Sequence, residues 1–469
     1  MNLIKKYTSI AFSALFMFSS VVSSPVEAAK GFSYKVVNKN KKTAILTKID
    51  TNKPLELKNP IDGYYIIEVA DNSSAYKQIK DRQMKKRIQE LESLVMEPDM
   101  IADCVRNLKS IGTNISYAGP KITSVNLPNC VRVGKNGFVF CNQLETIDLP
   151  DCESLAKGSL YGCTSLTRLN IPQCKRIDAF FDDDTEARFD PNYYSNYKQY
   201  DHQDYSVLSW INAPNCIEVA EKSLCGFKAL RSVDLDSCNI IGGQAFEKCT
   251  ALKSLKLPNC THINSTNSRN WRYSGGAFAG CEKLEFVRAP KLFYAGRSCF
   301  EDCKSLKKID FKNLKEIGCR FCYECRSLNT VLLDACTCIP DRSFFYCKSL
   351  VNVRIPNTVA IGESAFEGDE NIERMDLPNC NSVDKDSFRN CKKLCSFNAS
   401  NLRSIGKSAF EGDESLVEVS FPNCRLIQQN AFRGCKNLKK ITVPKSCKLE
   451  ENCLPFDLLI DQKLKIVRI

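Results

Sequence analysis

Apolar and polar residues alternate in short segments that recur every 22 residues over most of the chain. The stretch from Leu144 to Ser165, LETIDLPDCESLAKGSLYGCTS, shows one such unit. When the unit is numbered from 1 to 22, positions 1, 4 and 6 are mostly apolar, and positions 3 and 5 are mostly polar. This alternation predicts a short strand with one face inward. The strand should end at position 7, where proline is common, because proline has no N–H to donate.

Fourteen units can be recognised, the last of them degenerate, and one unit cannot bury its apolar face alone. The units must therefore stack into a single body with one core. Phenylalanine recurs at position 17, and we expect these rings to form a column in which each contributes about 1.5–3 kcal/mol by burial. At ~4.8 Å per strand, the stack should be about 65 Å long. The units begin at Ile122, Leu144, Leu166, Leu208, Leu230, Leu252, Leu284, Leu306, Leu328, Leu350, Ile372, Leu394, Leu416 and Leu438.

The first residues have the pattern of a signal peptide rather than of a folded element. Lys5 and Lys6 precede the apolar run 10–18, and a small-residue cleavage site follows at Ala28. The apolar run is too short to cross a bilayer. Residues 1–28 are therefore expected to direct export and to be removed, which predicts a secreted or cell-surface protein without a transmembrane segment.

The next part of the chain, 29–100, predicts an N-terminal cap region that covers the end of the core. Period-two alternation predicts strands near 32–36, 43–49 and 64–69. A helical period predicts a helix over 74–96, whose polar face is basic.

The stack proper is expected to occupy 122–459. Residues 101–121 echo the unit and predict a degenerate first repeat, and 460–469 predicts a cap strand that closes the other end. The repeat is interrupted by insertions at 182–207 and 264–274. Both enter between positions 12 and 17, so we expect them to emerge on one edge, about 14 Å apart along the stack.

The insertions hold most of the candidate ligand-binding residues, because tyrosine, tryptophan and arginine are enriched in interface hot spots. Trp210, at an outward strand position next to the first insertion, is a further candidate. The alternative interpretation is that both insertions are solvated loops that only cover the core. The candidates in the insertions are Tyr193, Tyr194, Tyr197, Tyr200, Tyr205, Trp271, Arg272 and Tyr273.

Cysteine is abundant, with 27 residues in the chain. It occupies position 9 in nine units and position 20 in nine units. Disulfides within a unit, disulfides between neighbouring units and buried free thiols are the alternatives. We favour free thiols, because several units lack one partner and because parallel side chains keep neighbouring Cβ atoms too far apart. Metal could be held by the run Cys319, Cys322 and Cys325 with Cys336 and Cys338. The repeat columns already account for Cys325 and Cys336, so no metal is expected.

Composition and charge narrow the classes of function. Hydrophobic residues make up 43% and charged residues 26%, which is typical of a globular protein. The net charge is +12, but the outward strand positions mix both signs, whereas a nucleic-acid protein should show a stripe of one sign. Only two histidines are present, and neither a phosphate loop nor a catalytic triad is visible. We therefore expect no nucleic-acid partner, no cofactor and no enzymatic activity.

The consensus L-x-x-I-x-L-P-x-C-x-x-I-G-x-x-A-F-x-x-C-x-x resembles the BspA-like (treponemal-type) leucine-rich repeat family over about 122–459. The resemblance implies an α/β solenoid with short parallel strands, and a secreted or surface protein that binds other proteins. We expect a monomeric module that binds a protein or glycan on a cell surface or matrix, in adhesion or host interaction. The alternatives are a hydrolase with carboxylates in 182–207 and a surface protein that self-assembles.

Overall fold

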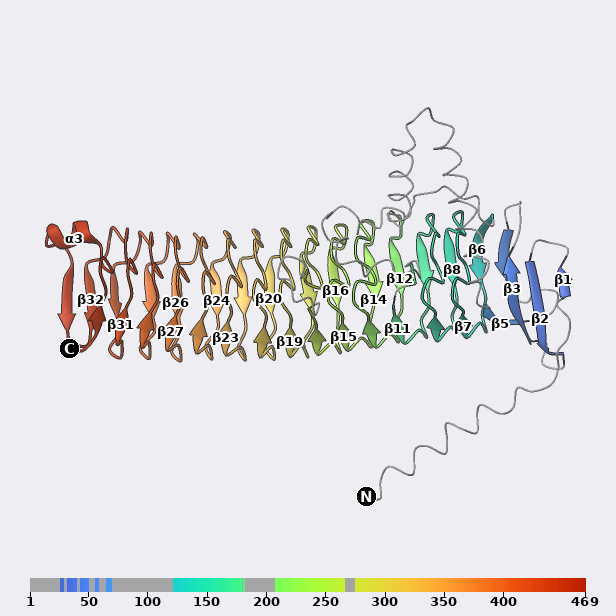
Figure 1. Cartoon of the computed structure of the whole chain (residues 1–469), viewed down its shortest axis with the longest axis horizontal. Helices are drawn as coiled ribbons and strands as arrows, with labels where there is room; N and C mark the ends of the chain where they lie inside the picture. The colour runs from blue at the N-terminus through green and yellow to red at the C-terminus, as the bar shows by residue number, and fades with distance from the viewer. Residues whose placement is uncertain are drawn as a thin grey trace, which may run out of the picture.

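Two rows of short parallel strands run along an elongated rod (Figure 1). The computed structural model describes five segments near the N-terminus and most of the residues after 120. The described ranges are 26–28, 32–39, 43–49, 55–58, 65–69, 121–178, 180–181, 207–265 and 275–469.

The first row contains the strand that the alternation predicts, at positions 3 to 5 of each unit. Neighbouring strands pair in parallel one unit apart, and Thr146 of one unit lies opposite Arg168 of the next. Hydrogen bonding divides the row into five sheets. Its strands are β6 (Ile122–Asn126), β8 (Thr146–Asp148), β10 (Arg168–Asn170), β12 (Trp210–Asn212), β14 (Ser232–Asp234), β16 (Ser254–Lys256), β18 (Phe286–Arg288), β20 (Lys308–Asp310), β22 (Thr330–Leu332), β24 (Asn352–Arg354), β26 (Arg374–Asp376), β28 (Ser396–Asn398), β30 (Glu418–Ser420), β32 (Lys440–Val443) and β34 (Lys465–Arg468).

The second row was not predicted from the sequence, because each of its strands has two residues, at positions 11 and 12. One of the two faces inward, as Leu155 does, and the other faces solvent. The strands are β7 (Arg132–Val133), β9 (Ser154–Leu155), β11 (Arg176–Ile177), β13 (Glu218–Val219), β15 (Ile240–Ile241), β17 (His262–Ile263), β19 (Tyr294–Ala295), β21 (Glu316–Ile317), β23 (Cys338–Ile339), β25 (Ala360–Ile361), β27 (Ser382–Val383), β29 (Ser404–Ile405), β31 (Leu426–Ile427) and β33 (Lys448–Leu449).

The N-terminal strands continue both rows rather than forming a separate layer. β4 (Leu55–Lys58), which was not predicted, pairs in parallel with β6, and β5 (Tyr65–Val69) pairs in parallel with β7. β5 is joined through β3 (Thr43–Ile49) and β2 (Phe32–Asn38) to β1 (Val26–Ala28). The expected signal-peptide cleavage site after Ala28 thus falls at the end of β1. The helix expected over 74–96 lies outside the described residues, as does the expected degenerate repeat apart from Lys121.

The C-terminal end carries the predicted closing strand, which is β34, paired in parallel with β32. It follows α3 (Phe456–Ile460), a five-residue helix that was not predicted and that is the single helix of the described residues. The expected solenoid of 22-residue units with short parallel strands is therefore confirmed.

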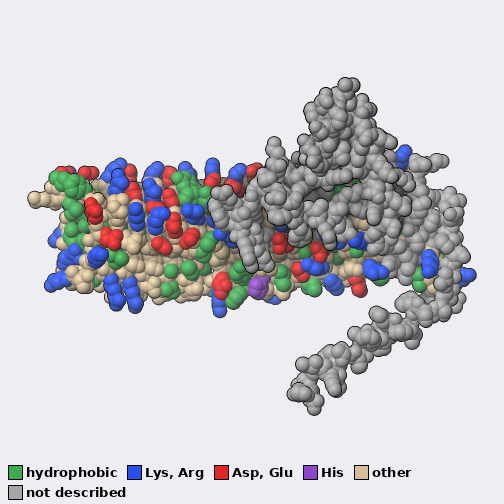
Figure 2. All heavy atoms as spheres, viewed as in Figure 1, with side chains coloured by type: hydrophobic (Ala, Val, Ile, Leu, Met, Phe, Trp, Pro, Cys, Tyr) green, Lys and Arg blue, Asp and Glu red, His purple; other side chains and the backbone are tan. Residues whose placement is uncertain are grey.

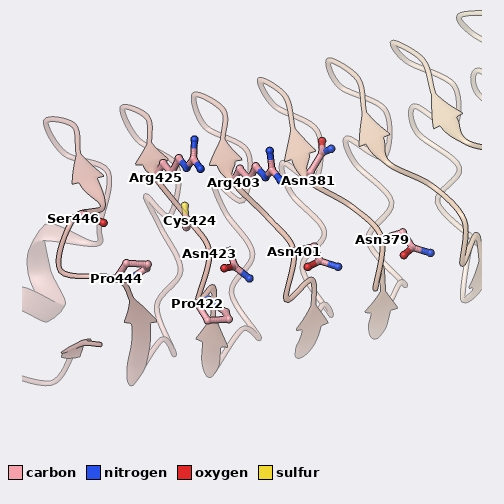
Figure 3. Close-up of a pocket in the computed structure, with 10 residues that line it drawn as sticks. All are labelled: Asn379, Asn381, Asn401, Arg403, Pro422, Asn423, Cys424, Arg425, Pro444 and Ser446. Atoms are coloured by element: carbon pink, nitrogen blue, oxygen red, sulfur yellow. The ribbon is translucent and has the colours of Figure 1, made fainter.

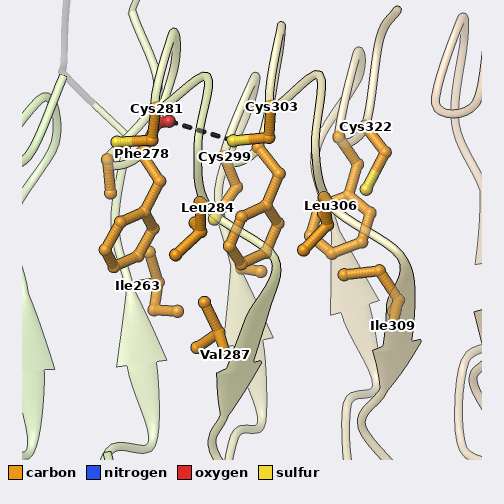
Figure 4. Close-up of a cluster of buried hydrophobic side chains, with 14 of the residues drawn as sticks. Ile263, Phe278, Cys281, Leu284, Val287, Cys299, Cys303, Leu306, Ile309 and Cys322 are labelled. Carbon is orange, nitrogen blue, oxygen red and sulfur yellow. Dashed lines mark hydrogen bonds between the residues drawn. The ribbon is translucent and has the colours of Figure 1, made fainter. Parts of the chain in front are cut away.

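The core is one continuous cluster between the two rows, in which the position-17 phenylalanines form the expected column (Figure 4). Phe366, Phe388 and Phe410 stack face to face, with centroid distances of 5.3 and 5.5 Å between neighbours. The contact between Phe300 and Phe321 is edge-on instead. There the unit carries Phe321 at position 16 and Cys322 at position 17.

Glycine at position 13 allows neighbouring units to approach closely. A Cβ on Gly242 would lie 2.4 Å from the backbone nitrogen of Glu221 in the preceding unit. A side chain therefore cannot be accommodated there without moving backbone, which explains why glycine follows the apolar residue at position 12 in many units.

Both cysteine columns use the thiol as a hydrogen-bond donor inside the coil. The nine at position 9 each donate to the carbonyl oxygen two residues later, over 3.1–3.4 Å, as Cys216 does to Glu218. Eight at position 20 donate to the position-17 carbonyl of the preceding unit over 2.9–3.2 Å. None of the 26 described cysteines forms a disulfide, in agreement with the free-thiol hypothesis.

Candidate binding surface on the first strand row

Trp210 lies on the outward side of β12, where its half-buried ring contacts the preceding strand. Parallel pairing places it opposite Arg168 of β10. The guanidinium carbon of Arg168 is 4.5 Å from the centroid of the indole ring, which is a cation–π contact. The contact holds both long side chains against the strand row, so a partner that binds there does not have to order them.

A row of polar side chains runs beside Trp210 at position 5 of successive units. Asn170 Nδ2 donates to Asp148 Oδ1 over 2.6 Å, and Asn212 Nδ2 donates to Asn170 Oδ1 over 2.7 Å. The next residue in register is Asp234, whose pKa is raised by burial and then by the nearby Asp236 carboxylate. We call Asp148, Arg168, Asn170, Trp210 and Asn212 together the Trp210 surface.

Trp210 is a candidate that the sequence predicts, whereas the polar row beside it is not. The signal was present, because position 5 reads Asn126, Asp148, Asn170, Asn212 and Asp234 over five successive units. Only the parallel register shows that these amides and carboxylates hydrogen-bond to each other across strands.

The first insertion leaves the stack unbroken, since β10 pairs directly with β12 across it. β16 likewise pairs with β18, and β17 with β19, across the second insertion. The eight aromatic and arginine candidates inside the insertions lie outside the described residues. Their proposed role in binding stays a prediction, and so does the joint edge on which both insertions should emerge.

Elsewhere the outward strand positions carry charges of both signs, interspersed over the C-terminal half of the rod (Figure 2). Many are paired, such as Lys308 with Asp310 at 2.8 Å and Lys440 with Glu418 at 3.3 Å. Exposed pairs of this kind contribute at most about 1 kcal/mol each. They define a mixed surface rather than a stripe of one sign.

The cysteine run that could have held metal is used in other ways. Cys325 donates its thiol proton to the Phe300 carbonyl and Cys336 to the Cys338 carbonyl. Within the described ranges, no three His, Cys, Asp or Glu side chains are grouped as a metal site requires.

The carboxylates of the alternative hydrolase hypothesis, in 182–206, lie outside the described ranges. Nor does any helix in the described part of the chain have the length and apolarity needed to cross a bilayer.

Three solved structures illustrate what the fold is similar to, although their TM-scores are low. A leucine-rich repeat protein from Bacteroides ovatus is 20% identical, with 94% of this chain and 99% of that chain covered and a TM-score of 0.49. A leucine rich cell surface protein from Faecalibacterium prausnitzii is 14% identical, with 96% of each chain covered and a TM-score of 0.32. The pneumococcal vaccine antigen PcpA is 13% identical, with 96% and 100% covered and a TM-score of 0.35.

None of the curated proteins compared with the chain matches it. The sequence profile of the BspA type Leucine rich repeat region, in contrast, matches residues 102–184, 191–274, 260–361 and 337–456. These ranges take in both strand rows, the phenylalanine column and both cysteine columns. The chain therefore belongs to the BspA-type leucine-rich repeat family.

Proposed function

We propose that this chain is an exported binding module that captures a protein partner at the cell surface through the Trp210 surface. The observation that carries this proposal is the contact between Arg168 and Trp210. It presents a large aromatic ring and a guanidinium, two of the commonest hot-spot groups, in one fixed arrangement.

The surroundings of Trp210 support a protein partner. Asp148, Asn170 and Asn212 hold each other in place, so their remaining lone pairs and N–H groups are oriented before binding. Such a polar border around an aromatic centre is the usual anatomy of a protein interface.

The experiment compares binding of the full chain and of Trp210→Ala to immobilised extracellular-matrix proteins and to whole bacterial cells. Phe286→Ala is the matched control, because Phe286 occupies the same outward position 3 three units further along and is exposed. We expect Trp210→Ala to weaken binding about 10- to 100-fold and Phe286→Ala to leave it unchanged. Equal effects of the two substitutions, or no effect of either, would contradict the proposal.

A second role, self-association through the C-terminal end, is favoured by a separate observation. Phe456, Ile460 and Ile469 are 65%, 63% and 55% exposed, although they are large apolar residues. Among the described strands, β34 pairs only with β32, so its other edge is open there. Open edges are templates for pairing with another chain. Light scattering should show association of the full chain that Ile460→Glu abolishes and the mid-rod control Val351→Glu does not. A monomer at every concentration, as expected from the sequence, would rule this role out.

A further inference from the structure

A groove of about 560 Å³ crosses the turns between the two strand rows in the last units of the stack (Figure 3). It is lined by asparagines at position 8 and by Asn381, Arg403 and Arg425 at position 10. The position-8 residues are Asn379, Asn401 and Asn423. Figure 3 shows the two sets of side chains as two roughly parallel lines, each with one residue per unit. We call this feature the Asn–Arg groove.

The asparagine line is oriented by the backbone of the preceding unit. Asn401 Nδ2 donates to the Pro378 carbonyl over 2.7 Å, and Asn423 Nδ2 donates to the Ser400 carbonyl over 2.9 Å. Each side chain is exposed. One N–H of each amide is thus used within the protein, whereas the Oδ1 acceptors remain for a ligand and repeat at the spacing of the strands, about 4.8 Å.

The arginine line has an equally fixed backbone. Arg403 N–H donates to the Asn381 carbonyl and Arg425 N–H to the Arg403 carbonyl, both over 2.8 Å. The two guanidinium groups are exposed. Neither forms an ion pair within the described part of the chain, whereas Lys436 and Lys440 nearby are paired with glutamates. No acidic residue lines the groove. Two unpaired guanidinium groups one unit apart are suited to bidentate binding of carboxylate or sulfate groups.

The lining distinguishes between two kinds of anionic polymer. An extended peptide gains main-chain hydrogen bonds only at an open strand edge, but the position-10 backbone is already paired between units. The groove also lacks a large apolar side chain, and its apolar lining comes mainly from Pro422 and Pro444. The two proline rings give shallow apolar contact for the C–H groups of sugars, and the repeating amide acceptors suit their hydroxyl groups.

We propose that the Asn–Arg groove binds an anionic polysaccharide. Its carboxylate or sulfate groups bind Arg403 and Arg425, and its hydroxyl groups donate to Oδ1 of Asn401 and Asn423. This site lies on other units than the Trp210 surface and on another part of the coil, so it goes beyond the proposed function and does not depend on it.

The test measures binding of the full chain to carboxylated, sulfated and neutral dextrans and to poly-glutamate of matched length. The variant is Arg403→Gln with Arg425→Gln. The matched control is Lys393→Gln with Lys407→Gln, which removes the same charge from exposed positions outside the groove. We expect binding to at least one anionic dextran and not to the neutral one. The arginine variant should bind about tenfold or more weakly, and the lysine control should bind like the parent chain.

The two anionic dextrans show whether carboxylate or sulfate is preferred, and either preference supports the proposal. Equal losses of binding in the arginine and lysine variants would show that the dextrans bind by non-specific charge attraction, and would overturn the proposal. Tighter binding of poly-glutamate would assign the groove to an acidic peptide instead, and failure of both anionic dextrans to bind would also overturn the proposal. Trp210→Ala should bind the dextrans normally, so the failure of one proposal is distinguishable from that of the other.

Discussion

The thiol of Cys303 donates a hydrogen bond of 3.2 Å to the carbonyl oxygen of Phe278, which lies 25 residues earlier in the chain (Figure 4). The same relationship links position 20 of a unit to position 17 of the preceding unit along the stack. The Phe278 carbonyl also accepts from the Cys281 N–H over 3.1 Å, so the thiol occupies its second lone pair. Cysteine supplies this second donor at a small cost in polarity. The cysteines are thus part of the contact between units.

We expect Cys303→Ala to lower the free energy of unfolding by about 1–3 kcal/mol, because it leaves a cavity and removes one of the two hydrogen bonds that the buried Phe278 carbonyl accepts. Cys395→Ala is the control, since Cys395 is exposed, and it should change stability by less than about 0.5 kcal/mol. Urea denaturation measures both. Similar shifts for the two variants would show that the buried hydrogen bond contributes nothing.

The described thiols should differ sharply in reactivity. Burial raises the pKa of Cys141 to about 12, so almost no thiolate is present at neutral pH. A thiol reagent should label the exposed Cys338 and Cys395 first and then the half-buried Cys319, and the buried columns only after denaturation. Mass spectrometry of the labelled peptides measures the order. Rapid labelling of Cys141 in the native protein would contradict this prediction.

The raised thiol pKa also predicts how stability responds to alkali. The folded state holds the proton of Cys141 more tightly than the unfolded state, whose thiol has the usual pKa of 9.0. This tighter proton binding by Cys141 stabilises the folded state in full below about pH 9, and the stabilisation is lost as the pH rises toward 12. Thermal melting temperatures should therefore fall over this range, and the fall should be smaller in Cys141→Ala.

Two aspartates replace cysteine at position 20, and we expect them to weaken the stack at neutral pH. Asp369 is completely buried, and burial raises its pKa well above the usual 3.8, although the nearby Cys347 N–H opposes the rise. Neither carboxyl oxygen has a hydrogen bond of good geometry within the described residues. Asp413 is also buried with a raised pKa, but its Oδ1 accepts from the Cys391 N–H. A protonated carboxyl can occupy a thiol position, whereas an ionised one cannot do so without a large penalty.

Asp369→Cys should therefore raise the free energy of unfolding by about 1–3 kcal/mol at pH 7. The folded state retains the proton of Asp369, so the parent chain loses stability as the pH rises above 3.8. The advantage of the variant should accordingly shrink as the pH falls toward 4. Melting temperatures measured from pH 4 to 8 check the trend, and a constant difference across this range would contradict it.

The phenylalanine column should tolerate truncation poorly. Phe388 is fully buried and stacks on Phe366 and Phe410 in the neighbouring units. Phe388→Ala should cost about 3–5 kcal/mol through lost burial and a cavity that the rigid coils cannot close. Phe286→Ala, at an exposed outward position, serves as the comparison. Denaturation measures both variants. If their midpoints were equal, the phenylalanine column would not stabilise the fold as predicted.

The sequence by itself determined the repeat and what each position does. Local patterning predicts the 22-residue period, the alternation around β8 and the phenylalanine at position 17, such as Phe388, because every unit must bury the same positions. The two-residue strands of the second row, such as β9, escaped prediction because two residues are too few to show alternation. β4 escaped because its partner β6 lies more than sixty residues later in the chain.

Only the tertiary structure decided which outward side chains meet. Arg168 and Trp210 are 42 residues apart in sequence but opposite each other in register. Arg403 and Arg425 are likewise 22 residues apart but line one groove. Stacking converts a long separation along the chain into a distance of about 4.8 Å. A surface made in this way belongs to several units at once, and no single unit of the sequence contains it.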